Sequence, residues 1–118
     1  MRASVRAILN DAGYRHGEVS IAVVDDETIA RLHREFLNDP APTDVLSFLL
    51  DRSAESIEGE VVVSAETAEA NAPRYRSTPS DELMRYVIHG TLHLVGHGDR
   101  TPRQRAAMRR RERQYLAR

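Results

Sequence analysis

The stretch TPSDELMRYVIHGTLHLVG, residues 78–96, has the start signal, apolar face and stop signal of a helix. Thr78 can cap the first turn, and Pro79 suits the first helical position, where no backbone donor is needed. Apolar residues then recur at intervals of three and four as far as Val95, which predicts one buried face. Gly96 supplies a common helix stop. We therefore expect the best-marked helix of the chain over residues 78–95.

Shorter elements are expected on both sides of this helix. Alternation of Val19, Ile21 and Val23 with small partners predicts a strand, and two short apolar or β-branched runs bounded by turn residues predict two more. The expected strands are 18–24, 43–50 and 59–64. Helices are expected at 2–12, 26–38, 64–72 and 102–116 from spacing, Asp or Ser caps and a glycine stop. The connections 38–43, 51–58 and 71–78 are the plausible flexible ones.

Length and composition limit the possible classes of protein. The 118 residues are enough for one compact domain, and 41% hydrophobic residues are too many for a disordered chain. The longest uncharged apolar runs are far shorter than the roughly 20 residues of a membrane span. With no signal peptide visible, the cytoplasm is the expected compartment. Because cysteine is absent, any metal must be bound by histidines and carboxylates.

Charge is distributed unevenly along the chain. Residues 100–118 contain eight arginines and one glutamate, which gives this segment +7 and the rest of the chain −8. Such a segment is equally consistent with a solvated helix face and with a phosphate-binding role. For a phosphate-binding role, the candidates are Arg100, Arg103 and the run 109–111.

Potential metal ligands cluster at the end of the best-marked helix. His89 and His93 are four residues apart, so their imidazoles lie on one face, a turn apart, and can converge on one ion. Beyond Gly96, where the chain can reverse, His97 and Asp99 are both candidates for the third ligand. Three protein ligands leave a position for water, as in catalytic zinc sites. The glutamate of the HExxH protease motif is missing, which disfavours zinc proteolysis.

Three blocks of sequence resemble the YbeY family of metal-dependent endoribonucleases. HGTLHLVGHGD, residues 89–99, is similar to the family's H-G-x-L-H-L-x-G signature. PTDVLSF, residues 42–48, looks like its second hallmark, and GEVVVS, residues 59–64, resembles its G-D-I-x-I-S strand with Glu60 in place of Asp. Their order and spacing agree over most of residues 18–116. The resemblance implies an α+β fold with a small mixed four-stranded sheet packed with helices and a metal site at the end of a central helix. The fourth strand is expected within residues 50–58.

The sequence departs from the family's pattern at two functional positions. The family's third metal ligand, commonly a histidine, corresponds to Asp99, and a carboxylate can replace imidazole on zinc at nearly the same bond length. His97 occupies the family's tyrosine position and remains a competing ligand or a supporting group. A basic residue that many members carry six positions before the Thr of the second block is Leu37 here.

The resemblance implies a single YbeY-like metal-dependent hydrolase domain, residues 1–118, that binds one zinc ion through His89, His93 and Asp99. Its expected activity is single-strand-directed RNA cleavage in ribosomal RNA maturation, at the 3′ end of the small-subunit RNA, and in ribosome quality control. Its expected partners are ribosomal RNA and the small ribosomal subunit. Asp44 and Glu60 are options for the general base, although Asp44 also suits a turn. Two alternatives are a non-catalytic zinc-binding ribosome-assembly factor and a zinc hydrolase of another substrate.

Overall fold

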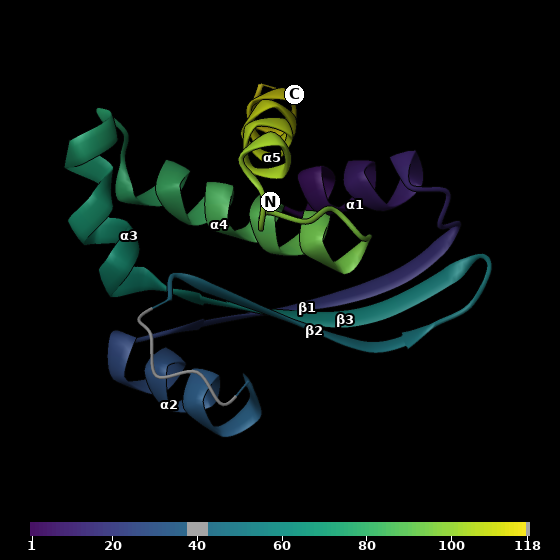
Figure 1. Cartoon of the computed structure of the whole chain (residues 1–118), viewed down its shortest axis with the longest axis horizontal. Coiled ribbons are helices and arrows are strands. Elements are labelled where there is room, and N and C mark those ends of the chain that lie inside the picture. The colour runs from purple at the N-terminus through teal and green to yellow at the C-terminus, as the bar shows by residue number, and fades with distance from the viewer. Residues whose placement is uncertain (38–42, 118) are drawn as a thin grey trace.

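A computed structural model describes residues 1–37 and 43–117 of the chain. It is an α+β fold built around a mixed sheet in the order β1-β3-β2. Helix α2 (Asp26–Leu37) covers one face of the sheet. Helix α4 (Pro79–Leu94) and helix α1 (Arg2–Asp11) lie on the other face, and α5 (Pro102–Leu116) packs against both of them (Figure 1). The α+β class and the mixed sheet are confirmed.

The sheet has three strands within the described part of the chain, so the prediction of four strands is wrong. β1 (His16–Val24) pairs in parallel with β3 (Ser56–Ser64), and β2 (Val45–Arg52) pairs antiparallel with β3. Residues 50–58, the expected place of the fourth strand, form the end of the hairpin between β2 and β3. The flexible connection expected at 51–58 is also wrong, because Arg52 still pairs with Ile57.

The helices begin and end close to the signals in the sequence. Thr78 caps α4 by accepting a hydrogen bond from the Asp81 amide, and Ser64 caps α3 (Ala65–Asn71) in the same way. Helix α1 is followed by Gly13 and α4 by Gly96, both with positive φ. The 3-10 helix η1 (Ala72–Tyr75) occupies part of the connection expected at 71–78. The expected helix end at Asn38, and the connection 38–43 apart from Thr43, lie outside the described residues.

Helix α4 is buried on two sides, which its single expected apolar face did not indicate. One side packs on the sheet and the other on α1 and α5, so Tyr86, Gly90 and Leu94 are buried as well as Ile88 and Leu92. In helix α2, Ile29 is buried against the sheet whereas Phe36 is 65% exposed, so only some of the helix's apolar residues are covered. No helix among the described residues has the length and apolar content needed to cross a membrane.

Gly90 lets α4 approach the sheet closely. A Cβ atom at this position would lie 2.6 Å from Val61 Cγ1 and 3.0 Å from Ser47 Oγ, which is too close for a side chain. Ser47 Oγ on β2 donates a hydrogen bond to the Gly90 carbonyl at 2.8 Å. The serine of the second sequence block and the glycine of the first therefore join β2 to the helix that carries His89 and His93.

Candidate metal centre

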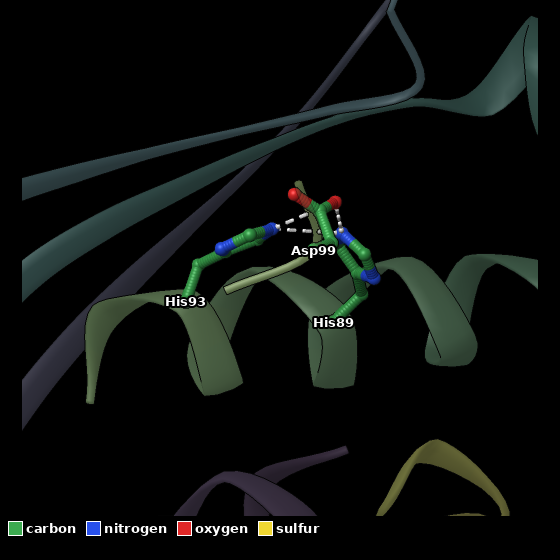
Figure 2. Close-up of side chains that lie close together, drawn as sticks. All are labelled: His89, His93 and Asp99. Carbon is green, nitrogen blue, oxygen red and sulfur yellow. Dashed lines mark hydrogen bonds and ion pairs between the residues drawn. The ribbon is translucent and has the colours of Figure 1, made fainter. Parts of the chain in front are cut away.

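His89, His93 and Asp99 converge at the C-terminal end of α4 (Figure 2). His93 Nε2 lies 3.0 Å from His89 Nε2 and 3.2 Å from Asp99 Oδ2, and His89 Nε2 lies 3.4 Å from the same carboxylate oxygen. The two rings lie one turn apart on α4, while Asp99 follows the turn that Gly96 makes possible with φ of +105°. All three side chains are partly buried.

The spacing of the three atoms fits a divalent cation. In a tetrahedral zinc site with bonds of about 2.0–2.1 Å, neighbouring ligand atoms lie about 3.3–3.4 Å apart. The three observed separations, 3.0, 3.2 and 3.4 Å, are close to this edge length. Two imidazole nitrogens and one carboxylate oxygen are ligands that zinc accepts, and three ligands leave one position open. The residues present can therefore hold a metal ion.

Glu112 fixes the orientation of the His89 ring. His89 Nδ1 lies 2.8 Å from Glu112 Oε2, and since an ionised carboxylate only accepts, Nδ1 donates its proton there. The lone pair of His89 Nε2 is then directed toward His93 and Asp99, as a metal ligand requires. Burial lowers the pKa of His89, but the hydrogen bond and charge of Glu112, with Asp99 and Asp44, outweigh it and raise that pKa above its ordinary value.

Glu112 is itself held by an ion pair with the half-buried Arg85. Only 3% of Glu112 is exposed, and its Oε1 accepts a hydrogen bond from Arg85 Nη1 at 3.3 Å. Arg85 also donates to both carboxylate oxygens of Glu82, at 2.8 and 3.0 Å. The hydrogen bonds to Glu82 hold the pKa of Arg85 above its ordinary value despite burial. This chain of contacts connects the first turn of α4, through α5, to the first histidine.

Sequence reasoning did not find Glu112. The available signal was that Glu112 is the single acidic residue of an otherwise basic helix. An isolated acidic residue in such a helix can indicate a specific partner elsewhere in the fold. The partner could not be inferred, because contact with His89 depends on how α5 packs across α4.

The segment after α4 brings in Asp99 and not His97. Among the described residues, the group of converging ligand atoms comprises His89, His93 and Asp99. Arg105 Nη1 supports this segment by donating to the carbonyl oxygens of Arg100 at 2.8 Å and Asp99 at 3.4 Å. Burial, followed by the charges of Arg111 and His93, lowers the pKa of His97. These effects favour the neutral form of His97.

Two clefts open on the converging residues and share Asp44, Val45, His89 and Asp99. The first, called here the α5 cleft, has a volume of about 630 Å³ and is also lined by Tyr75, Arg85, Arg109 and Arg113. The second, the β2 cleft, has a volume of about 700 Å³ and is also lined by His33, Leu49, Arg52 and Arg100. Because the clefts share His89 and Asp99, an extended substrate can reach these residues from either cleft.

The structure separates the other residues singled out in the sequence. Asp44 lines both clefts. Glu60 lies on the other face of the sheet, because it is two residues from Val62, which packs against Ile29 of α2. Of the candidate arginines, Arg100 lines the β2 cleft and Arg109 the α5 cleft. Arg103, Arg110 and Arg111 are not among the residues that line either cleft. Leu37 is the last residue of α2.

Comparison with known proteins identifies the family. The sequence model described as Endoribonuclease YbeY matches residues 1–118. The chain belongs to the YbeY endoribonuclease family. The Endoribonuclease YbeY of Rhodopirellula baltica is 49% identical over 85% of this chain and 53% of its own length. That of Chlorobaculum parvum is 36% identical over 98% of this chain and 81% of its own length.

A solved structure supports the fold of this YbeY family member. The solution structure of TM1509 from Thermotoga maritima matches with a TM-score of 0.63 at 27% identity, over 98% of this chain and 75% of that one. The chain spans about half the length of the Rhodopirellula relative and about four fifths of the Chlorobaculum one.

Proposed function

We propose that the chain is a zinc-dependent endoribonuclease directed at single-stranded RNA, formed as one hydrolase domain over residues 1–118. The observation that carries the proposal is the convergence of His89, His93 and Asp99 where the two clefts meet. Membership of an endoribonuclease family supports RNA as the substrate. The three residues would hold one zinc ion per chain, with His97 beside them.

The residues around the site suit hydrolysis of a phosphodiester. When bound, zinc supplies Lewis-acid chemistry, lowering the pKa of water and polarising a phosphodiester oxygen. Asp44 is the carboxylate placed to accept a proton, since it lines both clefts beside His89 and Asp99. Arg52 and Arg100 in the β2 cleft would bind phosphate and so compensate for Leu37 at the family's basic position.

The cellular role we propose is maturation of ribosomal RNA, at the 3′ end of the small-subunit RNA, together with ribosome quality control. The partners would be ribosomal RNA and the small subunit, and the compartment the cytoplasm. Support for this role comes from family membership and from the basic residues that line both clefts.

Cleavage of labelled RNA tests the proposal. The full chain, loaded with one equivalent of zinc, is incubated with a single-stranded RNA that spans the 3′ end of the small-subunit RNA, and with the same sequence as a duplex. We expect internal cleavage of the single strand, loss of cleavage with chelator and return of cleavage on adding zinc. His93→Ala should be inactive, while His97→Ala should retain activity.

Two outcomes would favour the alternatives. Metal-dependent binding to the small subunit without cleavage, even at high enzyme concentration, would indicate a non-catalytic assembly factor. Zinc-dependent hydrolysis of a small ester or amide, with RNA left intact, would indicate a hydrolase of another substrate. Either result overturns the proposed ribonuclease activity.

A further inference from the structure

We propose that the α5 cleft binds one strand of RNA, with phosphates on an arginine row of α5 and an unstacked base on Tyr75 of η1, which lines the same cleft. This inference rests on the proposed function, because it names the surface that would deliver RNA to His89 and Asp99. The arginine row and Tyr75 line the same cleft as His89 and Asp99. The strand would therefore run from the α5 cleft directly to the metal centre.

The arginine row consists of Arg105, Arg109 and Arg113, all lining the cleft. They are spaced four residues apart on α5, so their side chains follow one helix face with a rise of about 6 Å between neighbours. This rise is comparable with the separation of successive phosphates in an extended nucleic acid strand. Arg109 and Arg113 are exposed, and no ion pair of either appears among the described residues.

The acidic residues of the cleft do not cancel this row. Glu82 and Glu112 are engaged with Arg85, and Glu112 also with His89. Asp99 faces the two histidines. Asp44 and Asp81 also line the cleft, but they belong to the segment before β2 and to the first turn of α4, not to α5. The charges left for a ligand along the α5 wall are therefore those of the arginines.

Tyr75 presents an aromatic ring to the same cleft. The side chain is 65% exposed at the end of η1, although the Arg85 guanidinium lies 5.7 Å from its ring centroid. Arg85 contacts Tyr86 as well, at 5.3 Å, so Tyr75 rests on a fixed guanidinium and leaves ring surface for another group. The next residue, Arg76, has a φ of +52°, an unusual value for a residue other than glycine, and this ends η1 with Tyr75 at the cleft.

This arrangement selects single strands. An aromatic side chain stacks on a base only when the base is free of its neighbours, as in loops and single strands. In a duplex the bases are paired and stacked, so Tyr75 would have no base to contact. The arginine row alone would not distinguish single strands from duplexes, because it contacts only phosphate groups.

Two charge-matched variants test the arginine row. Arg109→Gln with Arg113→Gln removes two cleft arginines, whereas Arg103→Gln with Arg110→Gln removes two exposed arginines of α5 that do not line the cleft. Arg105 is left intact because it also supports the Asp99 segment. Binding of a fluorescein-labelled 12-nucleotide oligouridylate to the full chain is measured by anisotropy in chelator, over a range of salt concentrations.

The slope of log affinity against log salt decides the outcome. At about 0.7 for each phosphate contact of a single strand, loss of Arg109 and Arg113 should make the slope shallower by about 1.4. The control pair should keep the wild-type slope. Equal changes in both variants would show a response to net charge alone and overturn the arginine row.

Tyr75→Ala and Tyr75→Phe test the stacking wall against the same oligouridylate and an abasic 12-nucleotide strand. Tyr75→Ala should weaken binding to oligouridylate about tenfold and leave binding to the abasic strand unchanged. Tyr75→Phe, which keeps the ring, should bind both like the wild type. Equal loss for both strands, or no loss, would overturn the stacking role.

Failure of this inference is distinguishable from failure of the proposed function. If the wild type cleaves RNA with zinc but the cleft variants bind like the wild type, the RNA follows another surface and only the inference fails. If binding follows the cleft while no RNA is cut, the ribonuclease proposal fails and the binding site stands.

Discussion

At the residue scale, Glu112 should control how well His89 binds metal. Glu112→Ala removes the acceptor that directs His89 Nε2 toward the site, so zinc affinity should fall about 10- to 100-fold. Glu112→Gln keeps a carbonyl acceptor for Nδ1 but loses the charge, so its affinity should lie between those of the wild type and the alanine variant. Competition with a chromophoric zinc chelator at neutral pH measures both.

The control for Glu112 is Gln114→Ala, an exposed position on the same helix. It should bind zinc like the wild type. Because Glu112→Ala also leaves Arg85 with one carboxylate partner, its fold is checked by circular dichroism before titration. A folded Glu112→Ala protein with wild-type zinc affinity would show that His89 needs no orienting partner.

The residues of the candidate metal centre were more predictable from the sequence than the contacts that hold them in place. His89 and His93 follow from a spacing of one helical turn, and Asp99 from the turn that Gly96 allows, and the structure brings these three side chains together. Between His97 and Asp99, spacing alone could not decide, because the direction of the chain after Gly96 depends on contacts such as Arg105 with the Asp99 and Arg100 carbonyls. Glu112 depends on long-range packing and was missed for that reason.

At the element scale, the close contact between α4 and the sheet depends on Gly90. Gly90→Ala places a methyl group against Val61, and overpacking of about 1–3 kcal/mol should exceed the gain in helix propensity of about 1 kcal/mol. We expect a net loss of up to about 2 kcal/mol in the free energy of unfolding, measured by urea denaturation.

A double-mutant cycle with Val61→Ala tests the cause of that loss. The smaller side chain at position 61 makes room for the methyl group that Gly90→Ala adds, so the double variant should be more stable than the sum of the single effects predicts, by about 1 kcal/mol. Additive effects would mean that Gly90 is needed for a reason other than contact with Val61.

The ion pair between Glu82 and Arg85, both on α4, predicts a dependence of stability on pH. Hydrogen bonds from Arg85 lower the pKa of Glu82, so this group stabilises the fold above its unfolded pKa and loses the effect as pH falls through its folded pKa. Glu82→Gln should therefore melt at a lower temperature than the wild type near pH 7. The difference should shrink as the pH falls below about 4.5. Melting curves from pH 3 to 7 measure it.

The matched control for Glu82 is Glu69→Gln on α3, an exposed glutamate. Its melting temperature should follow that of the wild type across the pH range. A Glu82→Gln difference that stays constant down to pH 3 would assign the effect to lost packing and not to the carboxylate charge.

Element positions were largely predictable because their signals are local. Caps at Ser64 and Thr78 and positive φ at Gly13 and Gly96 require only neighbouring residues. Strands were predicted at 43–50 and 59–64, but the end of the β2–β3 hairpin within residues 51–58 was missed. This polar, exposed end lacks the apolar alternation of a half-buried strand and is formed by pairing with the partner strand. Burial of both sides of α4 depends in the same way on neighbours that no local pattern reveals.

For the whole molecule, a metal ion would join α4 to the segment before α5, and it should stabilise the fold as a ligand of the native state. At a free zinc concentration 100 times the dissociation constant, linkage gives about 2.7 kcal/mol, which corresponds to a rise in melting temperature of roughly 10 °C for a chain of this size. Calorimetry of the chelator-treated full chain, with and without zinc, measures the rise. His93→Ala and Asp99→Ala should lose most of it, and His97→Ala should keep it, because His97 is outside the converging group. If His97→Ala loses the rise while Asp99→Ala keeps it, His97 is the third ligand and the segment after Gly96 rearranges when metal binds.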